Sequence, residues 1–264
     1  MDRQLLIVST ICFLAAVMRT VIALGAGTFR LGRFNFLAIG LGFIFQTAFL
    51  SIRGHELHRC PVTNLFEVLI FLAWSVALIY MVIGPAYRLS LMGAFTAPLV
   101  FLIQTLALLA PIDVRHPAKL PANAWLEFHA SMSIVAYGAF ALACVAGVMY
   151  LVQERQLKTH QLHSFFYHLP PLTDLFAAIT RLLWVGFALY SLGLASGFFV
   201  DAPLPRVQVV CAFGVWLLYA AILQGRHLRR LAPTRVAALC IVGFAAALTL
   251  LWGISFTAQM HSLP

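Results

Sequence analysis

The chain has 264 residues, of which 62% are hydrophobic and only 9% are charged, and its formal net charge is +9. Because roughly a quarter of the residues of a soluble domain are charged, this composition excludes a soluble globular protein. A lipid-facing exterior needs no such charge, so we expect an integral membrane protein in contact with lipid. The positive charge then indicates attraction to anionic lipid, and no basic patch large enough to predict nucleic-acid binding is present.

Eight runs of mostly apolar residues follow one another along the chain, and each approaches the length of about 20 residues that a spanning helix needs. They lie at roughly 4–24, 35–52, 64–84, 89–110, 125–152, 173–200, 207–224 and 236–257. The first run contains Arg19, which is untypical of a cleaved signal peptide. The sequence therefore predicts an all-α bundle of about eight transmembrane helices that forms one domain, residues 1–264.

The distribution of lysine and arginine over the connections predicts the orientation of the bundle. Six of them lie on one side, in the N-terminus, in the connections after the second, fourth and sixth runs, and in the C-terminus: Arg3, Arg53, Arg59, Arg115, Lys119 and Arg206. Nine lie on the other side, in the connections after the first, third, fifth and seventh runs: Arg30, Arg33, Arg88, Arg155, Lys158, Arg226, Arg229, Arg230 and Arg235. Positively charged loops remain in the cytoplasm, so we predict that both termini lie outside it.

Two histidines lie where the alternating direction of the helices brings them to one membrane face. His129 comes just inside the start of the fifth run, and His261 comes just past the end of the eighth. Paired neutral imidazoles can ligate one haem iron from its two faces. Trp125 and Phe128 are near the depth of His129 and would suit a flat apolar porphyrin. A histidine at a helix end is also common as an ordinary interfacial residue, so the positions alone leave both interpretations open.

Glu67 lies at the start of the third run, where a charged carboxylate at membrane depth is costly unless it is paired. We expect a hydrogen-bonded or ionic partner for it on a neighbouring helix, with Arg53 and Arg59 as the candidates. Asn64 is placed to cap this helix by accepting a hydrogen bond from an N–H group of the first turn. A purely structural role for these residues is the alternative to a functional one.

Two arginines lie inside apolar runs, Arg19 in the first and Arg181 in the sixth. Because a charge within the membrane is costly, we expect both to face the bundle interior or an interface. Asp174 precedes Arg181 by seven residues, which is too far for a pair within one helix, so we expect an interhelical partner for this arginine.

Three segments resemble the CcsA-type cytochrome c assembly proteins, and the resemblance as a whole covers nearly the whole chain. The first is Pro61–Glu67, Pro-Val-Thr-Asn-Leu-Phe-Glu, which leads into a spanning run with Trp74. The second is Trp125–Tyr137, Trp-Leu-Glu-Phe-His-Ala-Ser-Met-Ser-Ile-Val-Ala-Tyr. The third is the short Met260–Ser262, Met-His-Ser, after the last run. The resemblance implies that His129 and His261 match opposing ligands of a haem, which we take as haem b.

The chain also departs from that family. The family's Trp-rich outer loop is absent, because the stretch after Gly197 reads Phe-Phe-Val-Asp-Ala-Pro-Leu-Pro, and Gln224 stands where the family has an inner histidine. This pattern is similar to the short YpjD and HemX type of bacterial inner-membrane protein. The resemblance therefore implies a haem-binding or haem-handling membrane protein associated with cytochrome c assembly or haem biosynthesis proteins, and not a haem lyase. A regulatory or scaffold protein of the same fold that no longer binds haem is the alternative.

Overall fold

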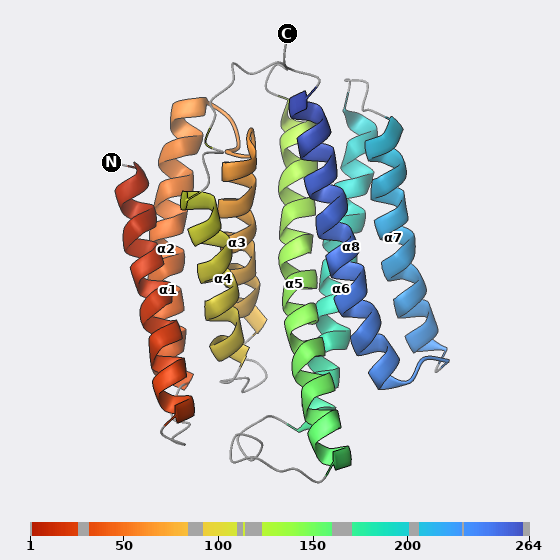
Figure 1. The fold of residues 1–264 in the computed structure, drawn as a ribbon. Helices are drawn as coiled ribbons and strands as arrows, with labels where there is room; N and C mark the ends of the chain where they lie inside the picture. Colours follow the sequence, from red (N-terminus) through yellow and green to blue (C-terminus); the bar gives the residue numbers. More distant parts are fainter. Residues whose placement is uncertain are drawn as a thin grey trace.

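The computed structural model describes residues 2–25, 32–83, 92–109, 113, 123–159, 171–200, 206–228 and 230–260, with side chains placed as far as Thr249 in the last range. Within these ranges the chain forms eight α-helices, one short 3₁₀ turn and no strand (Figure 1). The elements are α1 (Asp2–Gly25), α2 (Gly32–Leu57), α3 (Leu65–Ile83), α4 (Met92–Leu109), α5 (Ala124–Thr159), α6 (Leu172–Ser196), η3 (Gly197–Phe199), α7 (Arg206–His227) and α8 (Pro233–Met260).

The eight predicted runs correspond in order to the eight helices, so the predicted helix bundle is confirmed. Seven of the helices are long and apolar enough to cross a membrane, and α8 contributes the apolar stretch Pro233–Thr249 within its described side chains. The largest difference is in α5, which has 36 residues and continues to Thr159 instead of ending near residue 152. Its last residues are polar but are good helix formers, so the helix continues beyond the apolar run that predicted it.

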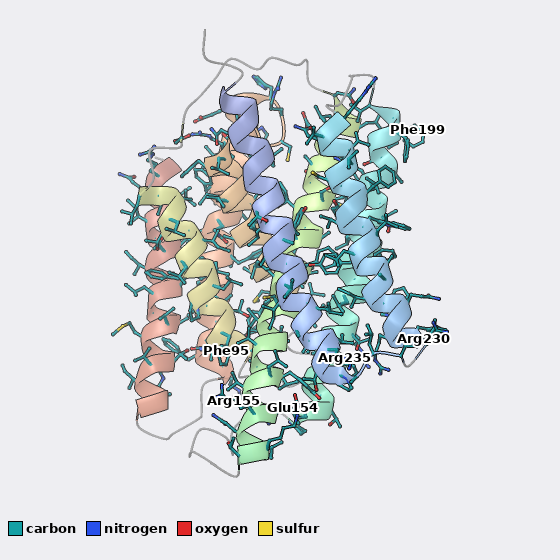
Figure 2. All side chains as sticks on the ribbon, turned by 45° about the vertical axis from the view of Figure 1, so that its right-hand side comes forward. Phe95, Glu154, Arg155, Phe199, Arg230 and Arg235 are labelled. Atoms are coloured by element: carbon teal, nitrogen blue, oxygen red, sulfur yellow. The ribbon has the colours of Figure 1, made fainter. Side chains whose placement is uncertain are left out.

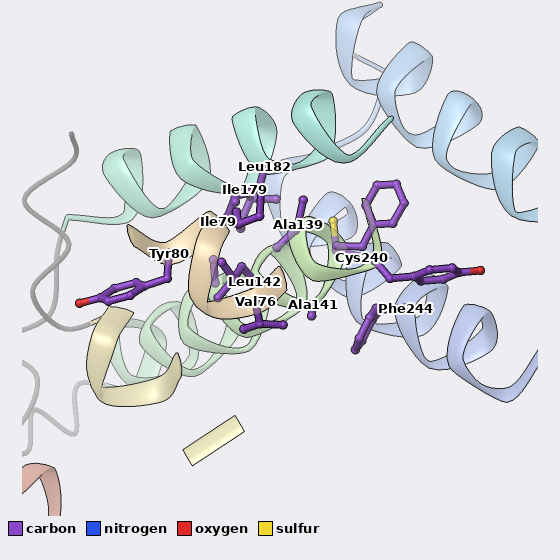
Figure 3. Packing of buried hydrophobic residues seen from close by; sticks show 14 of the residues in the cluster. Val76, Ile79, Tyr80, Ala139, Ala141, Leu142, Ile179, Leu182, Cys240 and Phe244 are labelled. Atoms are coloured by element: carbon purple, nitrogen blue, oxygen red, sulfur yellow. The ribbon is translucent and has the colours of Figure 1, made fainter. Parts of the chain in front are cut away.

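Helix α5 lies at the centre of the bundle (Figure 1). It belongs to the group α5–α8 and connects this group to the other, α1–α4, mainly through α3. It packs most extensively against α6 and also against α3 and α8. Small residues line much of its buried surface, as Ala139 and Ala141 show beside Val76 of α3 and Cys240 of α8 (Figure 3). Small side chains let helix backbones approach closely, and close packing is a main source of helix association in lipid.

The outside of the bundle carries large apolar side chains along its length and charged side chains at its lower end, as in a membrane protein. Arg155, Arg230 and Arg235 lie at the lower end, whereas Phe199 lies at the upper end (Figure 2). Between these ends, large apolar side chains are exposed on the outer surfaces of the helices, among them Ile11, Leu41, Ile44, Leu102, Leu106, Leu192, Leu217 and Val242. In lipid these side chains need no cover, which accounts for the composition.

Of the two places expected for Arg19 and Arg181, the bundle interior is wrong, and an interface stays a prediction. Both arginines are exposed on the outside of their helices. Arg19 lies six residues before the end of α1, with its guanidinium 6.0 Å from the centre of the Phe34 ring. A long side chain so near a helix end can carry its charge to the membrane surface while its aliphatic part stays in lipid, so an interior partner is not required.

Polar side chains are instead buried between α1, α2 and α4. Gln46 of α2 donates a hydrogen bond to the side-chain oxygen of Gln104 of α4. The Gln104 side-chain nitrogen in turn donates to the Leu6 carbonyl, at 2.8 Å, and to the Thr10 hydroxyl, at 2.9 Å, on α1. Both amides are fully buried, so these bonds hold three helices together at membrane depth.

Candidate functional site

At the upper end of the bundle, α1, α3, α5 and α7 begin and α2, α4, α6 and α8 end (Figure 1), and the predicted site residues that the structure describes lie there. His129 lies in the second turn of α5, and Glu67 lies in the first turn of α3. The described part of α8 ends here at Met260. His261 follows directly in the sequence but lies outside the described residues, so its pairing with His129 stays a prediction.

The ring of His129 is directed at the last turns of α6. Its Nδ1 atom lies 2.6 Å from the carbonyl oxygen of Gly193. A carbonyl oxygen only accepts hydrogen bonds, so Nδ1 must carry the proton and donate. In the neutral ring, Nε2 then keeps its lone pair, which is the arrangement that metal-ligating histidines adopt in proteins.

An apolar cavity of about 140 Å³ lies beside His129, between α5, the end of α6 and the start of α7. Phe198 and Phe213 contribute its aromatic wall, with ring centres 6.4 Å apart in an edge-to-face arrangement. Its other lining residues are Leu194, Gly197, Gln208, Val209 and Ala212. Its apolar lining with few polar groups is like that of small-molecule sites, but its volume is below the roughly 300–1,000 Å³ of such pockets, so it has room for only part of a flat aromatic ligand.

The two predicted aromatic neighbours of His129 lie on the outer surface at the start of α5. Trp125 is stacked on Phe199 of η3, with ring centres 4.9 Å apart and an interplanar angle of 30°. Trp125 and Phe128 are 49% and 43% exposed, and neither is among the described residues that line the cavity. The 3₁₀ turn thus places Phe198 at the cavity and Phe199 against Trp125. This turn lies where the Trp-rich loop would begin in the family that the sequence resembles.

Glu67 has the ionic partner that the sequence predicts. Its Oε1 atom lies 2.9 Å from Nε of Arg53, and the exposed fractions of the two side chains are 1% and 3%. The second carboxylate oxygen accepts from the N–H of Thr63 at 2.8 Å and from its hydroxyl at 2.7 Å. Asn64 caps α3 by accepting from the N–H of Glu67 at 2.8 Å, as predicted. Three donors therefore bind this buried carboxylate, which offsets the cost of its burial.

Arg53 has a second carboxylate partner that the sequence did not predict. Its terminal nitrogen lies 2.6 Å from one oxygen of Asp113, in the connection after α4, and Arg3 lies 3.0 Å from the other oxygen. Burial alone would raise the pKa of the Asp113 carboxyl. The hydrogen bonds that it accepts from Arg3 and Arg53, together with their positive charges, lower the pKa by more, so it lies below the ordinary value. The chain of ion pairs joins α1, α2, α3 and the segment after α4.

The loop between α2 and α3 is also held to α5 near His129. Glu127 accepts a hydrogen bond from the N–H of Cys60 at 3.1 Å, and the Cys60 sulfur lies 3.2 Å from the Ser131 hydroxyl. Burial raises the pKa of the Cys60 thiol, so the thiol and not the thiolate is the prevailing form. A protonated thiol is a weak nucleophile, and this contact therefore serves to attach the loop.

Sequence reasoning missed Gly193, Gly197, Phe198 and Phe213 as neighbours of His129. The spacing of Gly193 and Gly197 is the small-x-x-x-small pattern of close helix packing, and it was the one available signal. No pattern in the sequence indicates that a backbone carbonyl will face a particular histidine. The position of the cavity depends on how α6 and α7 pack, which local sequence does not encode.

Together these features define a polytopic α-helical membrane protein with a histidine-containing apolar cavity and a buried ion-pair network at one end. The family described as cytochrome C assembly protein matches residues 62–261, and the chain belongs to this family of membrane proteins related to cytochrome c assembly. The matched range includes Glu67, His129 and His261.

Curated relatives extend the similarity over most of the chain. Cytochrome c biogenesis protein CcsA of Mesostigma viride is 23% identical over 250 residues, which cover 81% of this chain and 80% of the relative. Protein HemX of Bacillus subtilis is 26% identical over 223 residues, covering 80% of this chain and 79% of the relative. Protein HemX of Brevibacillus brevis is 25% identical over 199 residues, covering 69% and 73%. The chain is thus similar to both kinds of protein that the motifs suggested.

Proposed function

We propose that this membrane protein binds or handles haem b at the upper end of the bundle, with His129 and His261 as paired axial ligands. The observation that carries the proposal is the hydrogen bond from His129 Nδ1 to the Gly193 carbonyl, because it leaves Nε2 free to ligate iron. The adjoining apolar cavity with Phe198 and Phe213 supports the same conclusion. His129 and His261 would hold the haem, and the haem would supply an iron centre whose spin state and potential depend on its ligands.

The residues of this chain would contribute binding and orientation. Trp125 and Phe128 are proposed to contact the porphyrin from the surface near His129. Asn64 and Glu67 are proposed to hold the start of α3 in place through the ion pair with Arg53. The partners proposed are membrane lipid and proteins of cytochrome c assembly or haem biosynthesis. We do not propose haem lyase activity, because the sequence lacks the Trp-rich loop.

An optical spectrum of the purified protein with supplied haem tests this proposal directly. The wild-type protein is expected to give a low-spin spectrum with sharp bands in the reduced state, because two imidazoles ligate the iron. Substitution His129→Ala or His261→Ala removes one axial ligand and is expected to abolish the spectrum or convert it to a high-spin form. The measurement is made on oxidised and reduced protein in detergent.

His160→Ala is the control, since the predicted topology assigns this residue to the opposite membrane face, and its spectrum is expected to match that of the wild type. Wild-type protein that stays colourless with haem in excess contradicts the proposal. That result would favour the regulatory or scaffold alternative, in which the fold is kept without its ligand.

The bundle is further proposed to lie in a bacterial inner membrane with both termini outside the cytoplasm. Reporter fusions after Arg230 are expected to give a cytoplasmic signal, and fusions after Lys119 or Pro264 an external one. The physical reason is that positively charged connections remain in the cytoplasm, and Arg226 in the last turn of α7 and Arg229 and Arg230 in the connection before α8 form a basic cluster. An external signal at Arg230 would reverse the orientation and place the His129 end in the cytoplasm.

A further inference from the structure

We propose that the end of α6 is a positioning device for His129, in which the Gly193 carbonyl fixes the protonation of the ring and Gly197 provides the space that the ring needs. This inference rests on the proposed function only in its consequence for haem. The positioning itself is a property of the haem-free protein. It assigns roles to Gly193 in the last turn of α6 and to Gly197 directly after it, neither of which has a side chain that could ligate iron.

The first step of the argument concerns the Gly193 carbonyl. Carbonyls in the last turns of a helix have spare acceptor capacity and carry the negative end of the helix dipole. Here the carbonyl oxygen accepts from the Ser196 hydroxyl at 2.6 Å, from the Gly197 N–H, and from His129 Nδ1 at 2.6 Å. If the ring carried its proton on Nε2 instead, the Nδ1 lone pair would face this oxygen at the same distance. That contact is repulsive, so the carbonyl selects the form with Nε2 unprotonated.

The second step concerns the space beside the ring. A Cβ atom added at Gly197 would lie 3.2 Å from Nδ1 and 3.4 Å from Cε1 of His129. A Cβ atom added at Gly193 would lie 2.9 Å from the Ser133 hydroxyl oxygen and 3.4 Å from the His129 carbonyl oxygen. The two glycines therefore let α6 approach α5 closely enough for the hydrogen bond to form. Alanine at position 197 would contact the imidazole ring more closely than ordinary van der Waals contact allows, so the ring would have to shift by a few tenths of an ångström.

The same two observations predict the consequence for a metal-binding ring. Groups that orient a ligating histidine through its second nitrogen typically affect metal affinity about 10–100-fold when they are changed. Gly197→Ala changes none of the proposed ligand residues and none of the cavity-lining aromatic residues, but it shifts the His129 ring relative to its acceptor, the Gly193 carbonyl. We therefore expect haem affinity to fall about tenfold or more in this variant.

The test uses the full-length, haem-free protein in detergent with ¹⁵N-labelled histidine, recorded at a pH where the ring is neutral. The His129 signals are assigned by their loss in His129→Ala. The wild-type ring is expected to have a protonated Nδ1 and an unprotonated Nε2, and Gly197→Ala is expected to give a mixture of the two forms. Ser196→Ala removes a hydroxyl that competes with His129 for the Gly193 carbonyl, and it adds no atom. The ring is therefore expected to stay protonated on Nδ1, with only the Nδ1 resonance shifted.

Gly214→Ala on α7 is the matched control, because a Cβ atom there has no neighbour within 4 Å, and its His129 spectrum is expected to equal that of the wild type. A wild-type His129 ring protonated on Nε2 would overturn the inference. So would His129 spectra that are identical in the wild type, Gly197→Ala and Ser196→Ala, whether or not haem binds. A ring protonated on Nδ1 that changes in Gly197→Ala supports the inference. If such protein then failed to bind haem, the proposed function alone would be wrong.

Discussion

Substitution Glu67→Ala is expected to lower the free energy of unfolding by about 3 kcal/mol, at the lower end of the range for breaking a buried ion pair. The Arg53 side chain is 3% exposed and would lose its Nε partner, while Asp113 would remain on its terminal nitrogen. Thr63 would lose the acceptor of two hydrogen bonds at the same time. Reversible unfolding in mixed detergent micelles, followed by tryptophan fluorescence, measures the difference.

The exposed pair of Lys158 and Glu154 provides the control for this prediction. It has a similar distance, 2.8 Å, but the lysine side chain is 71% exposed. Lys158→Ala is therefore expected to cost at most about 1 kcal/mol, as exposed pairs do. If both Glu67→Ala and Glu67→Gln unfold like the wild type, the buried pair does not stabilise the upper end of α3.

Gly138→Ala is expected to be the second strongly destabilising substitution, with a loss of about 1–3 kcal/mol or more from overpacking. A Cβ atom at Gly138 of α5 would lie 2.8 Å from Ser75 Cβ, 2.9 Å from the Ser75 carbonyl carbon and 3.0 Å from the Val76 nitrogen of α3. Two of these atoms belong to the backbone, so no change of rotamer relieves the contact and α3 must move away from α5. The same unfolding measurement detects the loss.

Gly214→Ala again serves as the reference, since both substitutions exchange glycine for alanine within a helix. With open space around its Cβ atom, Gly214→Ala is expected to be neutral or to gain up to about 1 kcal/mol from helix propensity. A Gly138→Ala variant that gained stability in the same way would show that α3 and α5 are not in direct backbone contact in the membrane. The seam between the two helix groups would then be looser than the structure indicates.

The parts of the fold that the sequence predicted are those that depend on composition and on single residues. Continuous apolar runs predicted the eight helices, because only helices satisfy their backbone groups inside lipid. The partner of Glu67 was predictable because a buried carboxylate requires a cation, and Arg53 directly follows the preceding run. Arg19 was misjudged since the cost of a charge at membrane depth falls near a helix end, where the side chain reaches the surface.

The surroundings of His129 were beyond such reasoning. The acceptor that fixes its ring is a backbone carbonyl of Gly193, which has no side chain to indicate it. Asp113 was missed as a partner of Arg53 because the pair joins residues 60 positions apart through the packing of α2 and α4. The pairing of His129 with His261 remains a prediction from helix direction and family resemblance.

The buried amides of Gln46 and Gln104 also constrain how the chain enters the membrane during synthesis. Gln46 precedes Gln104 by 58 residues. At a synthesis rate of roughly 5–20 residues per second, Gln46 emerges roughly 3–12 seconds before Gln104. For that time α1 and α2 carry polar groups whose native partners do not yet exist. Because unsatisfied polar groups in lipid are costly, the two helices are better retained beside the insertion machinery until α4 arrives than released singly into the bilayer.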